Sequence, residues 1–376
     1  MATVRQTESR RDEPIVRARR LVADLLVPRP AIYWIDMFVS IVVGYGAATV
    51  YLAPRAPAAV QAVAWLVAGC ALFRASLFMH EIVHFRRGEM RGFAATWNLL
   101  VGIPFLMPSF LYEHHLDHHS ARHYGTPRDA EYLPLGTARL GTLLAYLGQI
   151  LLLPLLATVR FLLLTPVSFL HPRLRRFVLE RCSPLVINLR HRRAVPADAP
   201  RGLWAAIEIA CFLRALHLAA CFLVNEVHLG RAVIPLGWQM PVKIYALALL
   251  ALGLNHVRTL AAHRYRSAGE SMGFAGQLDD SLNVVGRTPL AAVLFPVGLR
   301  YHALHHLFPA IPYHNLGVAH RRIMEQLPEW EAYRRATYAT FPEALRALAA
   351  GLREAWRQQP VAADRWFKKR DGEFAT

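Results

Sequence analysis

Long, nearly uncharged apolar runs dominate the hydrophobic pattern of this chain. Four of these runs are about 20 residues long, the length that an α-helix needs to cross roughly 30 Å of hydrocarbon. They cover residues 31–53, 58–79, 203–224 and 233–254. A short proline-containing turn joins the first two runs, and a short loop joins the last two. The pattern therefore predicts two transmembrane helical hairpins.

Two further apolar stretches, residues 97–112 and 140–170, lie between the hairpins and contain prolines. If each stretch crossed the membrane once, the histidines at 80–84 and those at 114–123 would face opposite sides. We expect instead embedded or interfacial segments that enter and leave the membrane on one side.

The rest of the chain is polar. Residues 1–30 form an arginine-rich tail, residues 31–322 the expected membrane domain, and residues 323–376 a C-terminal region of mixed charge. The sequence thus predicts an all-α integral membrane protein. It would have four transmembrane helices as two hairpins, embedded or interfacial helices, and a cytosolic helical cap.

Composition supports a membrane protein, because 55% of residues are hydrophobic and 18% are charged, against roughly 25% charged in soluble domains. The net charge of +17 raises the question of a nucleic-acid partner. The arginines, however, concentrate in the N-terminal tail and between the hairpins, where the positive-inside rule and lipid phosphates account for them. We therefore expect cytoplasmic termini and no nucleic-acid partner. Abundant arginine and alanine with few lysines is typical of a GC-rich bacterial genome, which suggests the bacterial inner membrane.

Clustered histidines are the strongest chemical signal in the sequence, which has 18 of them. HEIVH, HHLDHH and HALHH place imidazoles three and four residues apart, on one face of a helix, and a lone histidine follows the fourth run. The candidate ligands are His80 and His84, then His115, His118 and His119, then His263, and finally His302, His305 and His306. Neutral imidazole is the commonest protein metal ligand. Nine imidazoles are too many for one ion and about right for two. The sequence therefore predicts a dimetal site in the cap, and its nitrogen ligands point to iron and O₂ chemistry.

Two other classes of protein would also use such residues. HEIVH matches the HExxH motif of zinc proteases, but a protease of this kind would have no use for the histidines of the two other boxes. A haem-binding electron carrier or a metal transporter would place histidines or other polar groups within the spans, whereas most histidines here cluster at the ends of the spans.

The three boxes resemble those of the membrane fatty acid desaturase/hydroxylase superfamily. The continuation HHLFPAIPYHNL and the stretch RHYGTPRDAEYLP are similar to its acyl-lipid and sphingolipid branches, and the resemblance covers about residues 32–322. It implies two irons as cofactors, O₂ as co-substrate and a hydrophobic tunnel for a lipid acyl chain. By position, the nine histidines above would be the ligands and the catalytic residues. Where acyl-CoA desaturases have an asparagine four residues before the lone histidine, this chain has Thr259, so the tenth ligand stays open between His256 and a water.

The resemblance favours a fatty acid desaturase that introduces a C=C bond, with a hydroxylase or ketolase as the alternative. A shift of about 1 Å in the substrate carbon could change the outcome. No haem-binding HPGG segment occurs, so electrons are expected from a separate ferredoxin or cytochrome b5-like protein. Five carboxylates are predicted to accept the second ring N–H of ligating histidines. They are Glu81, Glu113, Asp117, Asp129 and Asp279.

Overall fold

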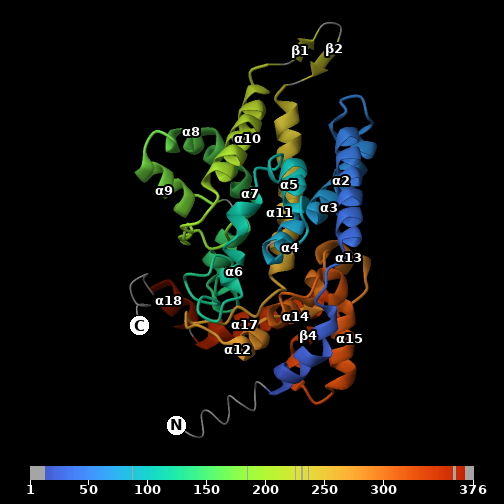
Figure 1. The fold of residues 1–376 in the computed structure, drawn as a ribbon, viewed down its shortest axis with the longest axis vertical. Helices are drawn as coiled ribbons and strands as arrows, with labels where there is room; N and C mark the ends of the chain where they lie inside the picture. The colour runs from blue at the N-terminus through green and yellow to red at the C-terminus, as the bar shows by residue number, and fades with distance from the viewer. Residues whose placement is uncertain are drawn as a thin grey trace.

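The computed structural model describes residues 13–368 apart from 87, 184, 225, 230–231, 236 and 359–360. This part of the chain is mainly helical, with two small two-stranded sheets (Figure 1). Five of its helices are long and apolar enough to cross a membrane. The prediction of an all-α integral membrane protein is confirmed, while the division of the chain at residues 30 and 322 stays a prediction.

The first hairpin agrees closely with the apolar pattern. It consists of α2 (Pro30–Leu52) and α3 (Ala58–Ser76), and α4 (Phe78–His84) continues α3 toward the cap. Pro30 stands at the first position of α2, where its missing N–H leaves no helical hydrogen bond unmade. The first histidine box therefore lies at the cap end of this hairpin.

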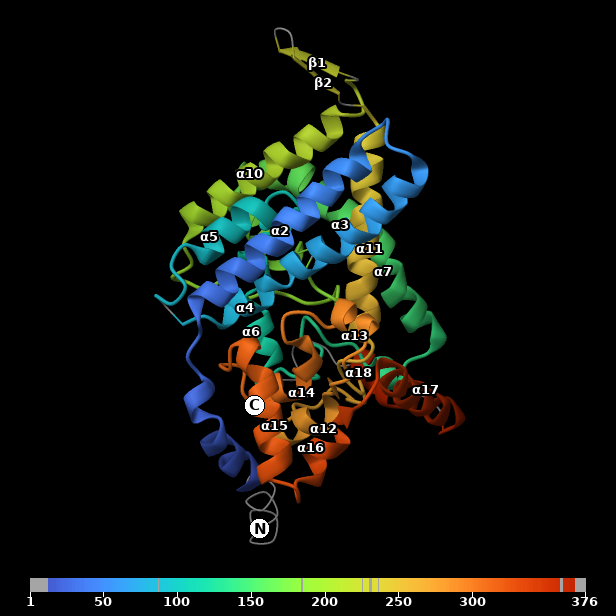
Figure 2. The same ribbon diagram turned by 90° about the vertical axis from the view of Figure 1, so that its right-hand side faces the viewer.

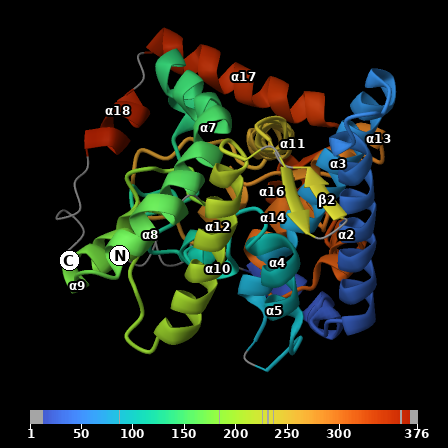
Figure 3. The same ribbon diagram turned by 90° about the horizontal axis from the view of Figure 1, so that it is seen from above.

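The second hairpin consists of α10 (Arg201–Ala220) and α11 (Gln239–Thr259). Between them, β1 (Glu226–Leu229) and β2 (Ala232–Pro235) pair antiparallel. The predicted start of the fourth span at residue 233 is wrong, because the apolar residues of β2 form a strand instead. The third span likewise ends four residues earlier than predicted. Seen from above, α11 stands between the first hairpin and α7 (Leu140–Val159) (Figure 3).

Both embedded stretches return to the end of the molecule from which they start. In the first, the Asn98 amide donates to Ser109 Oγ at 2.8 Å and the Ser109 N–H donates back to Asn98 Oδ1 at 2.9 Å. In the second, the segments before and after the excursion meet where Ile187 N donates to Ala130 O at 3.0 Å. The second stretch forms an apolar helix over Leu140–Ser168, which is long enough to cross a membrane in addition to the four helices of the two hairpins.

These excursions and the cap are built from short elements. The excursions contain α5 (Phe93–Trp97), η2 (Asn98–Gly102), η3 (Ser109–Tyr112), α6 (His115–His118), η4 (Leu135–Thr137), η5 (Arg160–Leu164), α8 (Thr165–Ser168) and α9 (Pro172–Arg181). The cap contains η1 (Ala23–Leu25), α12 (Phe274–Asp280), β3 (Asn283–Val284), α13 (Pro289–Leu294), η6 (Leu299–Tyr301), α14 (His302–Leu307), η7 (Tyr313–Asn315), α15 (Leu316–Gln326), α16 (Glu331–Arg335), β4 (Thr337–Tyr338), α17 (Phe341–Gln358) and α18 (Val361–Lys368). The helices of the cap gather below the long apolar helices (Figure 2).

A buried ion cluster ties the second excursion to α10. Glu208, which has no exposed surface, pairs with Arg160 and Arg175. The Arg160 guanidinium also donates to Thr165 Oγ1 at 2.5 Å and to Cys182 O at 3.1 Å. One carboxylate therefore compensates the charge of two arginines that lie among apolar helices.

We expect Glu208→Ala to destabilise the protein by about 3–5 kcal/mol, because removal of one partner leaves buried charges uncompensated. The measurement is thermal unfolding of detergent-purified protein. Glu331→Ala is the control, because Glu331 forms an exposed pair with Arg335, and should unfold like wild type. Equal midpoints for Glu208→Ala and wild type would contradict this role.

Candidate metal centre

All nine predicted histidines meet at the junction of the cap with the membrane helices. They form two groups, and within each group the ring nitrogens lie within 4.8 Å of one another. The first group is His80, His84, His115, His119 and His305, and the second is His118, His263, His302 and His306. Each group thus draws on more than one histidine box, although the boxes are far apart in sequence.

Local structure turns the boxes toward this point. His80 and His84 lie one turn apart on α4, and α6 is a single turn that begins at His115. His302 begins α14, which carries the third box. Backbone hydrogen bonds connect the lone histidine to this box. His263 forms an isolated antiparallel β-bridge with Ser281, and the carbonyl of the next residue, Leu282, accepts from Ala303 N at 3.2 Å.

Carboxylates and a hydroxyl orient several of the rings. His118 Nδ1 lies 2.8 Å from Asp129 Oδ2, and His115 Nδ1 lies 2.6 Å from Glu131 Oε1. His263 Nδ1 lies 2.7 Å from the hydroxyl of Tyr124. An Nδ1–H that donates to an acidic oxygen leaves the lone pair on Nε2, and such partners raise the basicity of a metal ligand. In these rings, Nε2 is the atom left to bind a metal.

The electrostatic environment keeps most of these rings neutral. Burial, together with the neighbouring histidines, lowers the pKa of His115, His119, His305 and His306 well below 6.5. For His118, burial lowers the pKa but the Asp129 carboxylate outweighs it, and the net shift is upward. Neutral imidazole is the form that binds metals, so the site favours the ligand form at neutral pH.

The arrangement fits two metal ions. Ring nitrogens of different histidines face one another at short range, with Nε2–Nε2 distances of 3.0 Å for His119 and His115 and 2.8 Å for His302 and His263. Facing lone pairs repel unless a cation lies between them. With metal–imidazole bonds of about 2.0–2.1 Å, two ligand nitrogens on opposite sides of one ion are about 4 Å apart. The ring nitrogens of each group lie within 4.8 Å of one another, so each group has the size that one ion requires.

Of the five carboxylates that were predicted to accept a ring N–H of the candidate ligands, one clearly does so. Asp129 bonds His118, but Asp117 bonds His123 at 3.2 Å and Glu113 pairs with Arg193 at 2.7 Å. Glu81 lies 3.5 Å from His80 Nδ1, yet it accepts from the Tyr33 hydroxyl at 2.6 Å and from the Tyr313 N–H at 3.1 Å. Both of these bonds fall on Oε2 of Glu81 and tie this side chain to α2 and η7.

Sequence reasoning missed other residues beside the ligands. Glu131 bonds His115, and Tyr124 connects His263 to Asp280 through a 3.0 Å hydrogen bond. Asp280, rather than the predicted Asp279, thus lies at the site. Glu131 stands two residues after the predicted Asp129, in the same stretch RHYGTPRDAEYLP. Its closeness in sequence to Asp129 could have identified it as a second carboxylate partner of the histidines.

The position expected for a tenth ligand does not supply one. His256 belongs to neither group, since its Nδ1 lies 2.9 Å from Leu252 O and its ring packs on Tyr146. The hydroxyl of Thr259 donates to Asn255 O at 2.7 Å.

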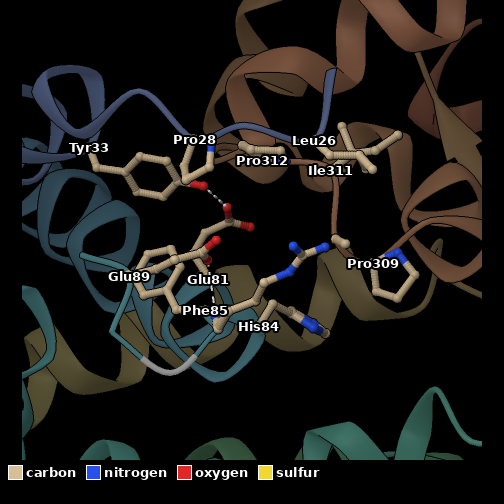
Figure 4. A pocket seen from close by; sticks show the side chains of 12 residues that line it. Leu26, Pro28, Tyr33, Glu81, His84, Phe85, Glu89, Pro309, Ile311 and Pro312 are labelled. Carbon is tan, nitrogen blue, oxygen red and sulfur yellow. Dashed lines mark hydrogen bonds between the residues drawn. The ribbon is translucent and has the colours of Figure 1, made fainter. Parts of the chain in front are cut away.

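A small surface pocket reaches the first group beside His84. Figure 4 shows its lining, which includes Tyr33, Glu81 and Pro312. Its volume of about 30 Å³ exceeds the roughly 10–15 Å³ that a cavity needs to hold one water. This pocket can admit a water-sized molecule and is far too small for an acyl chain.

Fold and site together define a membrane protein whose histidine groups could hold metal ions. The model of the fatty acid desaturase family matches residues 56–338. A ceramide hydroxylase from Caulobacter vibrioides (strain NA1000 / CB15N) is 38% identical over 339 residues, which cover 90% of this chain and 93% of the relative. No solved structure matches the chain significantly. The chain belongs to the fatty acid desaturase family and is a membrane-bound lipid oxidoreductase.

If both groups bind metal, His118→Ala and His305→Ala each remove a ligand from a different group. We expect about two ions per chain in the wild type and a substantial loss in each variant, measured by elemental analysis of purified protein. His320→Ala should keep the wild-type content, because His320 lies in the cap and bonds the Tyr333 hydroxyl. A single zinc that survives both substitutions would refute the dimetal assignment.

Asp129→Asn tests the role of the carboxylate behind His118. We expect metal affinity to fall about 10–100-fold, measured by competition with a chelator. Asp117→Asn is the matched control, because Asp117 bonds His123, which is in neither group. Similar affinities in the two variants would show that Asp129 does not support the ligand.

Proposed function

We propose that this protein is an O₂-dependent di-iron hydroxylase of a ceramide-type lipid. The observation that carries the proposal is the 38% identity, over 90% of the chain, to a protein named ceramide hydroxylase. That similarity favours hydroxylation, the alternative in the sequence analysis, over the desaturation that the third box favoured. The histidine boxes are common to both outcomes and do not discriminate between them.

In this proposal the nine histidines hold two irons, five imidazoles around one and four around the other. Bound iron would supply O₂ activation and the attack on an unactivated C–H bond. One oxygen atom enters that bond and the other leaves as water, with two electrons and two protons taken up. The chain supplies the positions of the ligands. Asp129 and Glu131 accept from the Nδ1 atoms of His118 and His115, and eight of the nine rings are buried away from solvent.

The proposal places the cap and both termini in the cytoplasm of a bacterium, below the inner membrane. The arginine-rich tail and the arginines after the second excursion support this orientation through the positive-inside rule. A separate electron carrier, a ferredoxin or a cytochrome b5-like protein, would deliver the electrons. An acidic carrier suits the net charge of +17, because complementary charge speeds association.

Lipid mass spectrometry after expression in a ceramide-producing host tests the proposal. We expect ceramides that have gained one oxygen, and we expect the His305→Ala variant to lack them. Loss of two hydrogens instead would identify a desaturase. Unchanged profiles in every lipid class would reject both reactions.

A further inference from the structure

Two polar side chains lie at the cap end of α11, just before the lone histidine. Asn255 and Arg258 are three residues apart and share one helix face. The Arg258 guanidinium donates to Asn255 Oδ1 from Nη2 at 2.9 Å and from Nε at 3.3 Å. The asparagine therefore fixes the orientation of the guanidinium.

The cap end of α11 lies beside the second histidine group. The carbonyl of Thr259, the residue after Arg258, accepts from the Tyr265 hydroxyl at 2.8 Å, and the ring of Tyr265 packs on His263 with centroids 5.2 Å apart. Arg258 and Asn255 therefore stand on the end of the helix that adjoins the centre.

Arg258 has no carboxylate partner among the described residues. The nearby Glu131 is engaged, because Oε1 lies 2.6 Å from His115 Nδ1 and Oε2 accepts from Tyr112 at 2.9 Å. Arg258 Nη1 and Asn255 Nδ2 have no hydrogen-bond partner in the described chain, and both side chains are half-buried. A cation withdrawn from water without an anion is costly. The two side chains present unused N–H donors to whatever binds there, which selects an oxygen acceptor.

We infer that Arg258 and Asn255 bind an oxygen of the polar end of the lipid, the amide carbonyl or a hydroxyl of a ceramide, beside the metal centre. This inference rests on the proposed function. Carbonyl and hydroxyl oxygens accept hydrogen bonds from guanidinium and amide N–H groups without bringing a further charge into the site. Held in this way, the polar end sets which carbon of the chain lies at the metals.

The test compares iron-loaded, detergent-purified wild type with Arg258→Gln. The probes are a fluorescent short-chain ceramide and a hydrocarbon that carries the same fluorophore. We expect Arg258→Gln to weaken ceramide binding about ten- to hundredfold, as loss of a hydrogen bond to a charged group predicts, and to leave hydrocarbon binding unchanged. Arg258→Lys keeps the charge but loses the planar fork, so it should recover only part of the affinity.

Arg287→Gln is the matched control, because Arg287 is an exposed arginine of the cap outside the site, and it should bind both probes like wild type. Iron content is measured in every variant to exclude collapse of the centre. Equal ceramide affinity in Arg258→Gln and wild type, or no ceramide binding by wild type, overturns the inference. If wild type binds ceramide but never oxidises it, the proposed function fails, while the binding comparison still decides the role of Arg258.

Discussion

The structure depends on bringing nine mainly neutral imidazoles to one buried place. Each neutral ring carries a lone pair, and buried acceptors without partners are costly. Among the described residues, His80 has no hydrogen-bond partner at either ring nitrogen, and the Nε2 atoms of His302 and His263 face each other at 2.8 Å. Two cations would satisfy the facing nitrogens and turn their mutual repulsion into shared coordination. Metal binding and folding of the cap should then be coupled, because the free energy of binding becomes free energy of folding.

This requirement explains why the membrane part contains excursions as well as spans. The boxes lie on different segments, and their histidines meet only if the segments between them return to the same end. The reciprocal bonds of Asn98 and Ser109 close the first excursion, and the contact of Ile187 with Ala130 closes the second. Between these closures lies α6, which carries the second box. The ion cluster of Glu208 then anchors the second excursion to α10 within apolar surroundings.

The sequence predicted those features that depend on local pattern. Apolar length gave the first hairpin almost to the residue, and helical spacing identified the nine histidines that converge. The predictions from sequence pattern were wrong where tertiary contacts determine the local structure. The apolar residues 232–235 suit a strand as well as a helix, so the start of α11 was misplaced. Asp117 lies inside the second box, yet on the short α6 it turns toward His123. The nearby loop instead supplies Asp129 and Glu131, and no periodicity reveals which loop carboxylates face the rings.

The same reasoning separates the proposed metal centre of this chain from the features that decide its product. The resemblance of the three histidine boxes is to desaturases and hydroxylases alike, so the boxes do not decide between the two outcomes. Selection requires control over which C–H bond lies at the metals, and small displacements carry large consequences. The acyl chain offers only apolar contact, which is non-directional. Directional control must come from polar groups beside the centre, and Arg258, held by Asn255 at the end of α11, offers unused donors at that position.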